Sequence, residues 1–235
     1  MRRACLTLTP LLIIIFSWSL CLADGGTVFF IVDGETVAQL ECQEFPMAKP
    51  IKLAGRSGGS GCYQRSGLID NVYVELGETG VVCNEDFQCF EVGGWVLYGE
   101  PSPVILLDFG NPLPCLMTSG DSWYDSGICS EALYNWSAGF HFAAYAHVDQ
   151  QAAFHSVEMG IADQDAPTDE GIGHVIGVNW KTSGQGDYIL QLDTDIETVQ
   201  VPAPSCGQWH WIEIIGIPTT SVESTDWGSI KALYR

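Results

Sequence analysis

The side chains with the clearest capacity for ligand chemistry lie at alternate positions of three apolar segments, residues 140–148, 154–162 and 209–215. A β-strand directs successive side chains to opposite faces of its sheet, so this alternation predicts strands with one face in a core and the other outside it. The predicted outward positions hold His141, Tyr145, His147, Glu158, Trp211 and Glu213.

These residue types suit the recognition of sugars. Aromatic rings stack on the apolar faces of sugar rings, while carboxylates and imidazoles form hydrogen bonds with sugar hydroxyls. Large aromatic side chains gathered on one exposed face indicate a contact surface. We therefore predict a carbohydrate-binding surface, and the alternative is an ordinary solvated sheet face.

A second group of chemical interest is acidic. Asp163, Asp165 and Asp169 crowd one predicted loop, and carboxylate oxygens are the ligands that calcium prefers. The spacing does not match that of an EF-hand, and a solvated acidic loop is the alternative interpretation. Calcium is the only cofactor that the sequence leads us to expect.

Charge and composition limit the partners. The chain of 235 residues has a net charge of −20, which disfavours binding to nucleic acid or to an anionic membrane surface. Hydrophobic residues make up 46% and charged residues 16%, so a sizeable packed core is expected. The remaining partner class that fits the outward residues is a polysaccharide or a glycosylated surface.

The N-terminus has the pattern of a secretory signal. Arg2 and Arg3 precede an apolar run from Leu11 to Phe16, and Cys21-Leu22-Ala23 fits a cleavage site. The run is shorter than a bilayer span, so residues 1–23 are predicted to be removed rather than to anchor the chain. The protein is therefore expected to be secreted or at the cell surface, and not an integral membrane protein.

Export makes disulfides the default expectation for the cysteines. Removal of residues 1–23 leaves seven of the nine cysteines, so at least one stays unpaired within the chain. Plausible local pairs are Cys42 with Cys62, Cys83 with Cys89, and Cys115 with Cys129. The last pair is the one that we favour.

Most of the remaining chain alternates with period two, which predicts an all-β protein built as a two-sheet antiparallel sandwich. Asp33-Gly34 between two such segments predicts a type I′ hairpin turn. The predicted strands are residues 27–32, 35–40, 50–53, 68–74, 94–98, 104–107, 140–148, 154–162, 174–180, 188–192, 198–201 and 209–215.

Several short motifs resemble the laminin-G-like, concanavalin A-type lectin/glucanase domains. Gln208-Trp209-His210-Trp211-Ile212-Glu213-Ile214 resembles a strand found late in these domains. The elements that follow it in the family resemble Val32-Asp33-Gly34, Leu53-Ala54-Gly55-Arg56 and Leu68-Ile69-Asp70-Asn71-Val72, which here come first. The resemblance implies a jelly-roll sandwich.

This inverted order is accounted for by circular permutation. Residues 24–215 would then form one domain, in which residues 24–76 match the C-terminal part of the family, 86–215 its N-terminal part and 77–85 a new linker. Two incomplete domains in tandem are the alternative. Residues 216–235 are set apart as a tail. Its last stretch, residues 225–235, resembles short tails that end some secreted bacterial proteins.

The resemblance implies a lectin or carbohydrate-binding module and leaves two alternatives open. Laminarinase-type members carry Glu-x-Asp-x-x-Glu on one strand, and the nearest match here runs from Glu158 to Asp163 with Gly160 in place of the middle Asp. A glycoside hydrolase is therefore one alternative. The other is a structural or adhesive domain without a small ligand.

Overall fold

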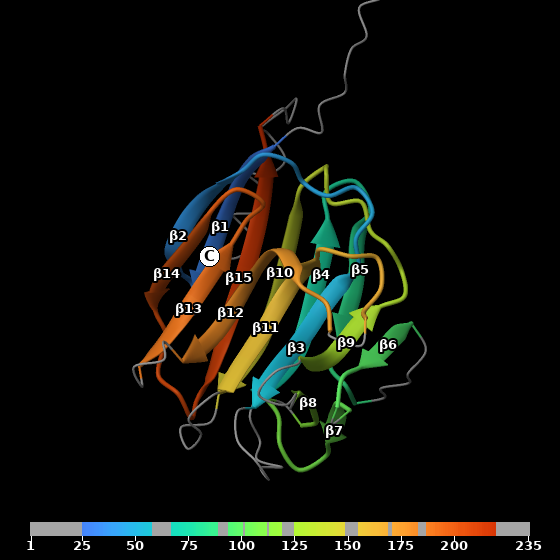
Figure 1. The fold of residues 1–235 in the computed structure, drawn as a ribbon, viewed down its shortest axis with the longest axis vertical. Helices are drawn as coiled ribbons and strands as arrows, with labels where there is room; N and C mark the ends of the chain where they lie inside the picture. The colour runs from blue at the N-terminus through green and yellow to red at the C-terminus, as the bar shows by residue number, and fades with distance from the viewer. Residues whose placement is uncertain are drawn as a thin grey trace, which may run out of the picture.

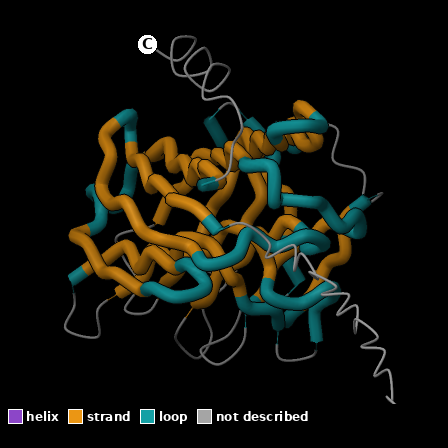
Figure 2. The backbone as a smooth tube through the Cα atoms, turned by 90° about the horizontal axis from the view of Figure 1, so that it is seen from above, coloured by secondary structure: helices purple, strands orange, loops and turns teal. Residues whose placement is uncertain are grey.

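The computed structural model describes residues 25–57, 67–88, 94–100, 102–111, 113–118, 125–148, 155–168, 171–182 and 187–219. Within these ranges the chain folds into fifteen strands and no helix, arranged as two antiparallel sheets packed face to face (Figures 1 and 2). The sheets form a sandwich that does not close into a barrel, which confirms the predicted fold class at this level.

The first sheet has eight strands and lies behind the other in Figure 1. Its order along the sheet is β2 (Glu35–Cys42), β1 (Gly26–Val32), β15 (Trp209–Pro218), β10 (Phe140–Val148), β4 (Gly67–Leu76), β8 (Cys115–Thr118) and β7 (Val104–Leu106). The eighth strand, β5 (Gly80–Glu85), pairs with the other half of β4.

The second sheet has seven strands and lies in front. Its order is β14 (Thr198–Pro202), β13 (Tyr188–Asp193), β12 (His174–Thr182), β11 (His155–Ala162), β3 (Ile51–Ser57), β9 (Ser126–Ser130) and β6 (Trp95–Tyr98).

Both sheets combine strands from the N-terminal part of the chain with strands from its C-terminal part. In the first sheet β15 lies between β1 and β10, and in the second β3 lies between β11 and β9. One hydrophobic core joins the two inner faces, and it contains Phe30, Phe142, Met159 and Trp180, each at most 1% exposed. Residues before and after position 85 therefore build the same sandwich.

The hairpin turn predicted at Asp33-Gly34 is present in the structure. Asp33 and Gly34 both have positive φ (50° and 85°) and join β1 to β2, as a type I′ turn requires. Trp136 is fully buried, and its indole Nε1–H donates to the carbonyl of Lys49 at 2.9 Å.

The predicted linker and the predicted disulfide differ from the structure. Residues 80–85 of the predicted linker form strand β5. The predicted disulfide between Cys115 and Cys129 is absent: Cys115 lies on β8 in the eight-stranded sheet, Cys129 lies on β9 in the seven-stranded sheet, and no bond joins them. No disulfide is found among the five cysteines that the structure describes, residues 42, 83, 115, 129 and 206.

Candidate functional sites on the two outer faces

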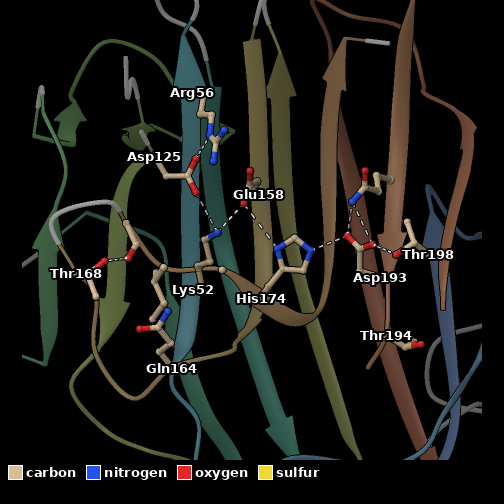
Figure 3. Close-up of a pocket in the computed structure, with 14 residues that line it drawn as sticks. Lys52, Arg56, Asp125, Glu158, Gln164, Thr168, His174, Asp193, Thr194 and Thr198 are labelled. Atoms are coloured by element: carbon tan, nitrogen blue, oxygen red, sulfur yellow. Dashed lines mark hydrogen bonds and ion pairs between the residues drawn. The ribbon is translucent and has the colours of Figure 1, made fainter. Parts of the chain in front are cut away.

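The outer face of the seven-stranded sheet carries a buried lysine between two carboxylates. Lys52 lies in the middle of β3, and its side chain is fully buried. Its ammonium nitrogen lies 2.5 Å from Oε2 of Glu158 on β11 and 3.3 Å from Oδ2 of Asp125, the residue before β9 (Figure 3). One cation therefore binds two carboxylates from neighbouring strands.

The ionic contacts continue from both carboxylates. On one side, Asp125 also accepts a hydrogen bond from the Arg56 guanidinium, further along β3. On the other, His174 Nδ1 lies 3.7 Å from Glu158 Oε2, and His174 Nε2 lies 2.9 Å from Asp193 Oδ2 on β13. We refer to these six residues, Arg56, Asp125, Lys52, Glu158, His174 and Asp193, as the ionic chain.

Contacts within the ionic chain shift the pKa values of three of its members. Burial alone would raise the pKa of Glu158, but the Lys52 ammonium and His174 outweigh burial and lower it. Burial alone would lower the pKa values of Lys52 and His174, and the neighbouring carboxylates raise both instead. The contacts therefore favour the charged forms of Glu158, Lys52 and His174.

A polar groove of about 530 Å³ lies over this network. The connection between β11 and β12 forms one wall, where Ile172 is buried in a small cluster with Ala54 and Tyr98. Gln191, Thr194 and Thr198 contribute polar side chains on the side of β13 and β14. The full lining is Lys52, Arg56, Asp125, Glu158, Gln164, Thr168, Gly171, Ile172, Gly173, His174, Gln191, Asp193, Thr194 and Thr198.

The outer face of the eight-stranded sheet carries a different site, which we call the aromatic cleft. It has a volume of about 520 Å³, and its lining is Asp33, Asn71, Tyr73, Asn84, His141, Tyr145 and Trp211. Tyr145 on β10 and Trp211 on β15 are direct register partners, and their ring centroids are 4.8 Å apart.

The structure divides the predicted ligand residues between these two faces. His141, Tyr145 and Trp211 line the aromatic cleft, and Glu213 contacts His141 at 2.8 Å. His147 lies on the same face of β10, 5.4 Å from the ring of Trp209. Glu158 points outward as its strand parity predicted, but from the other sheet.

The structure describes two of the three predicted calcium residues, Asp163 and Asp165. Asp165 is paired with Lys49 at 2.7 Å, Asp163 is exposed, and Asp169 lies outside the described residues. Among the residues that the structure places, no group of three His, Cys, Asp or Glu side chains is arranged to hold a metal ion. Calcium binding stays a prediction from the sequence.

The laminarinase-type motif fails at its middle position for a steric reason. A Cβ added to Gly160 would collide with the carbonyl oxygen of Ile176 and lie 2.6 Å from Cα of Gly177, on the neighbouring strand β12. No carboxylate fits there without a shift of the backbone. Glu158, with its lowered pKa and its lysine partner, is also poorly suited to donate a proton as a general acid.

Sequence reasoning did not identify Lys52, Arg56, Asp125, His174 or Asp193 as site residues. Parity within β3 places Lys52 and Arg56 on one face, opposite Ile51 and Leu53. That signal shows which residues share a face. It does not show that β3 lies beside β11 and β9, which is what brings Glu158 and Asp125 to the lysine.

Comparison with known proteins yields no relative: no family model, no curated protein and no solved structure matches the chain. A search for membrane spans finds, in the part of the chain that is described, no helix long and apolar enough to cross a bilayer.

Proposed function

We propose that the protein binds carbohydrate without catalysis, through the aromatic cleft, on a polysaccharide or a glycosylated surface. The observation that carries the proposal is the pairing of Tyr145 with Trp211, two partly exposed rings with centroids 4.8 Å apart in a depression of about 520 Å³. Aromatic rings in this setting offer a stacking surface for a sugar ring.

The polar groups around the rings support a sugar rather than an apolar ligand. The amides of Asn71 and Asn84 and the carboxylate of Asp33 line the same cleft. Amides donate and accept hydrogen bonds, so they match the hydroxyls at the edge of a sugar ring. His141, held by Glu213 at 2.8 Å, lies at the same depression.

We also propose that the sandwich is a circularly permuted jelly roll of the concanavalin A type. In the family order, the strand equivalent to β15 would continue into β1. The two strands lie side by side here: Gly26 is the register partner of Pro218, and the Thr219 amide donates to the Gly25 carbonyl at 2.9 Å. This proximity supports a permutation in which the chain was opened between β15 and β1. The original ends of the family domain would then be joined by residues 77–85.

The predicted signal, residues 1–23, lies outside the described residues and supports a secreted or cell-surface location. Such a location would bring the cleft into contact with extracellular polysaccharide. The hydrolase alternative has less support, because the motif lacks its middle carboxylate and Gly160 has no room for one.

A glycan array probed with the wild-type protein and two tryptophan variants tests the proposal. Trp211→Ala should weaken binding at least about tenfold, the usual scale for a buried aromatic contact in an interface. Trp209→Ala is the matched control, because Trp209 lies on the same face of β15 but does not line the cleft. An array without signal, or equal losses in both variants, would refute binding at the cleft.

A further inference from the structure

We propose that the groove over the ionic chain is a second binding site, on the sheet opposite the aromatic cleft, and that its ligand is an anionic sugar unit bearing a carboxylate or a sulfate. This inference concerns a different face of the molecule and a different ligand class from the proposed function. It rests on where the protein places its cations, on which hydrogen-bonding groups are already used, and on an imidazole nitrogen that forms no hydrogen bond among the described residues.

Positive charge is concentrated on one side of an acidic protein. The strands of the eight-stranded sheet contain no lysine or arginine. Of the four lysine and arginine residues that the structure describes, Lys52 and Arg56 line the groove, and Lys181 donates to the groove residue Gln191 at 2.6 Å. The chain carries a net charge of −20, so among the described residues the groove is where cationic side chains are available to attract an anion.

The carboxylates of the groove are committed to protein donors. Asp125 accepts from Lys52 and Arg56, and Glu158 accepts from Lys52 and from Asn179 Nδ2 at 2.8 Å. Asp193 accepts from Gln191 Nε2 and from Thr198 Oγ1, at 2.9 and 2.7 Å. These carboxylate oxygens already accept hydrogen bonds from the protein. They are therefore poorly placed to bind a metal ion or a ligand that donates hydrogen bonds. The groove therefore favours a ligand that itself supplies acceptor oxygens.

One donor in the groove lacks a protein acceptor. His174 is nine-tenths buried, and its Nε2 is bonded to Asp193. Its Nδ1 has no hydrogen-bond partner among the described residues, since Oε2 of Glu158 at 3.7 Å is beyond hydrogen-bond distance. The neighbouring carboxylates raise the pKa of His174, so Nδ1 carries a proton over a wider range of pH. This nitrogen faces Glu158 and is excluded from solvent, so a ligand oxygen reaches it only when the Glu158 side chain moves aside.

The size and lining of the groove fit a sugar unit. A volume of about 530 Å³ is within the range of small-molecule sites, and polar side chains form most of the lining. Arg56 is the cation that a ligand would meet first, because its side chain is 46% exposed while Lys52 is fully buried. A guanidinium binds carboxylates and sulfates through paired hydrogen bonds.

Calorimetric titration of the whole protein tests the proposal with three probes of equal length: tri-galacturonate, a sulfated galactose trisaccharide and neutral maltotriose. We expect one of the two anionic probes to bind with a Kd of about 1 mM or tighter. The first two probes distinguish a carboxylate ligand from a sulfate ligand. Added salt should weaken the interaction, because it screens the exposed guanidinium.

Two charge-removing variants separate a specific site from general attraction. Arg56→Gln should weaken anion binding at least about tenfold, the scale of a lost charge-assisted hydrogen bond. Lys49→Gln removes the same charge outside the groove lining, from the exposed pair with Asp165, and should change the affinity little. Equal losses in the two variants would overturn the proposal.

An independent measurement covers the case in which Arg56→Gln disturbs the fold. In the wild-type protein, the imidazole nitrogen resonances of His174 should shift when the anionic probe is added, and those of His141 in the aromatic cleft should not. Absence of binding by both anionic probes at concentrations above about 1 mM, or a shift of His141 alone, would overturn the proposal. If Trp211→Ala removes the anion binding, the ligand lies in the aromatic cleft and the groove is not the site.

Discussion

The ammonium of Lys52 lies 2.5 Å from a carboxylate oxygen of Glu158, and both side chains are almost completely excluded from solvent. The two residues are 106 positions apart in the sequence and meet because β3 and β11 are neighbours. Burial of an ion pair costs desolvation free energy that the pair's own attraction only partly recovers. Removal of one member of such a pair leaves the other as an uncompensated buried charge.

Lys52→Met should destabilise the protein strongly. The substitution keeps an unbranched side chain, one atom shorter, but leaves Glu158 and Asp125 without the buried cation that compensates them. Breaking a buried pair in this way costs about 3–5 kcal/mol of unfolding free energy, measurable by urea denaturation. Lys49→Met is the matched control, because its pair with Asp165 is exposed and should contribute less than about 1 kcal/mol. Similar losses of unfolding free energy in both variants would mean that the buried Lys52 pairs stabilise the protein no more than the exposed pair does.

The contribution of His174 to stability should fall as pH rises. Burial and Lys52 act to lower its pKa, but Asp193 and Glu158 outweigh them and raise the pKa above the usual value of 6.5. A group with a raised pKa in the folded state stabilises it fully below the unfolded pKa and loses that contribution as pH rises through the folded pKa. The difference in unfolding free energy between wild type and His174→Gln should therefore be largest near about pH 5.5 and smallest near about pH 9. A difference that grows with pH would contradict this.

The carboxylate partner gives the opposite dependence. Hydrogen bonds from His174, Gln191 and Thr198 lower the pKa of Asp193, although burial acts to raise it. Its stabilising contribution is present above the unfolded pKa of 3.8 and is lost as pH falls through the lower folded value. Asp193→Asn should thus lose more stability at neutral pH than at about pH 2, as seen in denaturation curves at both values.

The alternation of apolar and polar residues predicted the type and position of most strands, because burial of one sheet face imposes a period of two. The bounds predicted for residues 140–148 agree with β10. Strands β8 and β9 were missed because they lack this period: Ser126–Ser130 is buried at all five positions, and Cys115–Thr118 is buried at three of its four. A short strand buried on both faces carries no polar side to reveal it.

The predicted site was only partly assembled correctly, because parity fixes the face of each residue but not the sheet of each strand. Tyr145 and Trp211 meet because β10 and β15 are neighbours, whereas Glu158 belongs to the opposite sheet. The ionic chain joins residues from β3, β11, β12 and β13 and from the start of β9. Such a set depends on strand order, which the chain does not encode locally.

Buried thiols should be unreactive in the folded protein. Burial, together with Asp195, raises the pKa of Cys42 to about 12, and burial raises the pKa of Cys129 to about 11. Since the thiolate is the reactive form, iodoacetamide at about pH 8 should label neither residue until denaturant is added. Mass spectrometry of labelled peptides checks this, with the same reaction in urea as the control. Rapid labelling of Cys129 in the native protein would contradict its buried position on β9.

Substitution of Gly160 should show why the catalytic motif is incomplete. An added Cβ would collide with the Ile176 carbonyl and approach Cα of Gly177, so Gly160→Ala should cost about 3 kcal/mol, the upper range for a packing clash. Gly80→Ala is the matched control: its φ is also positive, but no atom lies within 4 Å of the added Cβ, so strain alone should cost about 1 kcal/mol. Gly160→Asp, which restores the middle carboxylate of the laminarinase-type motif, should unfold more readily than Gly160→Ala and release no reducing sugar from β-glucan. A stable Gly160→Asp protein that hydrolyses glucan would instead show that this strand accommodates a hydrolase site.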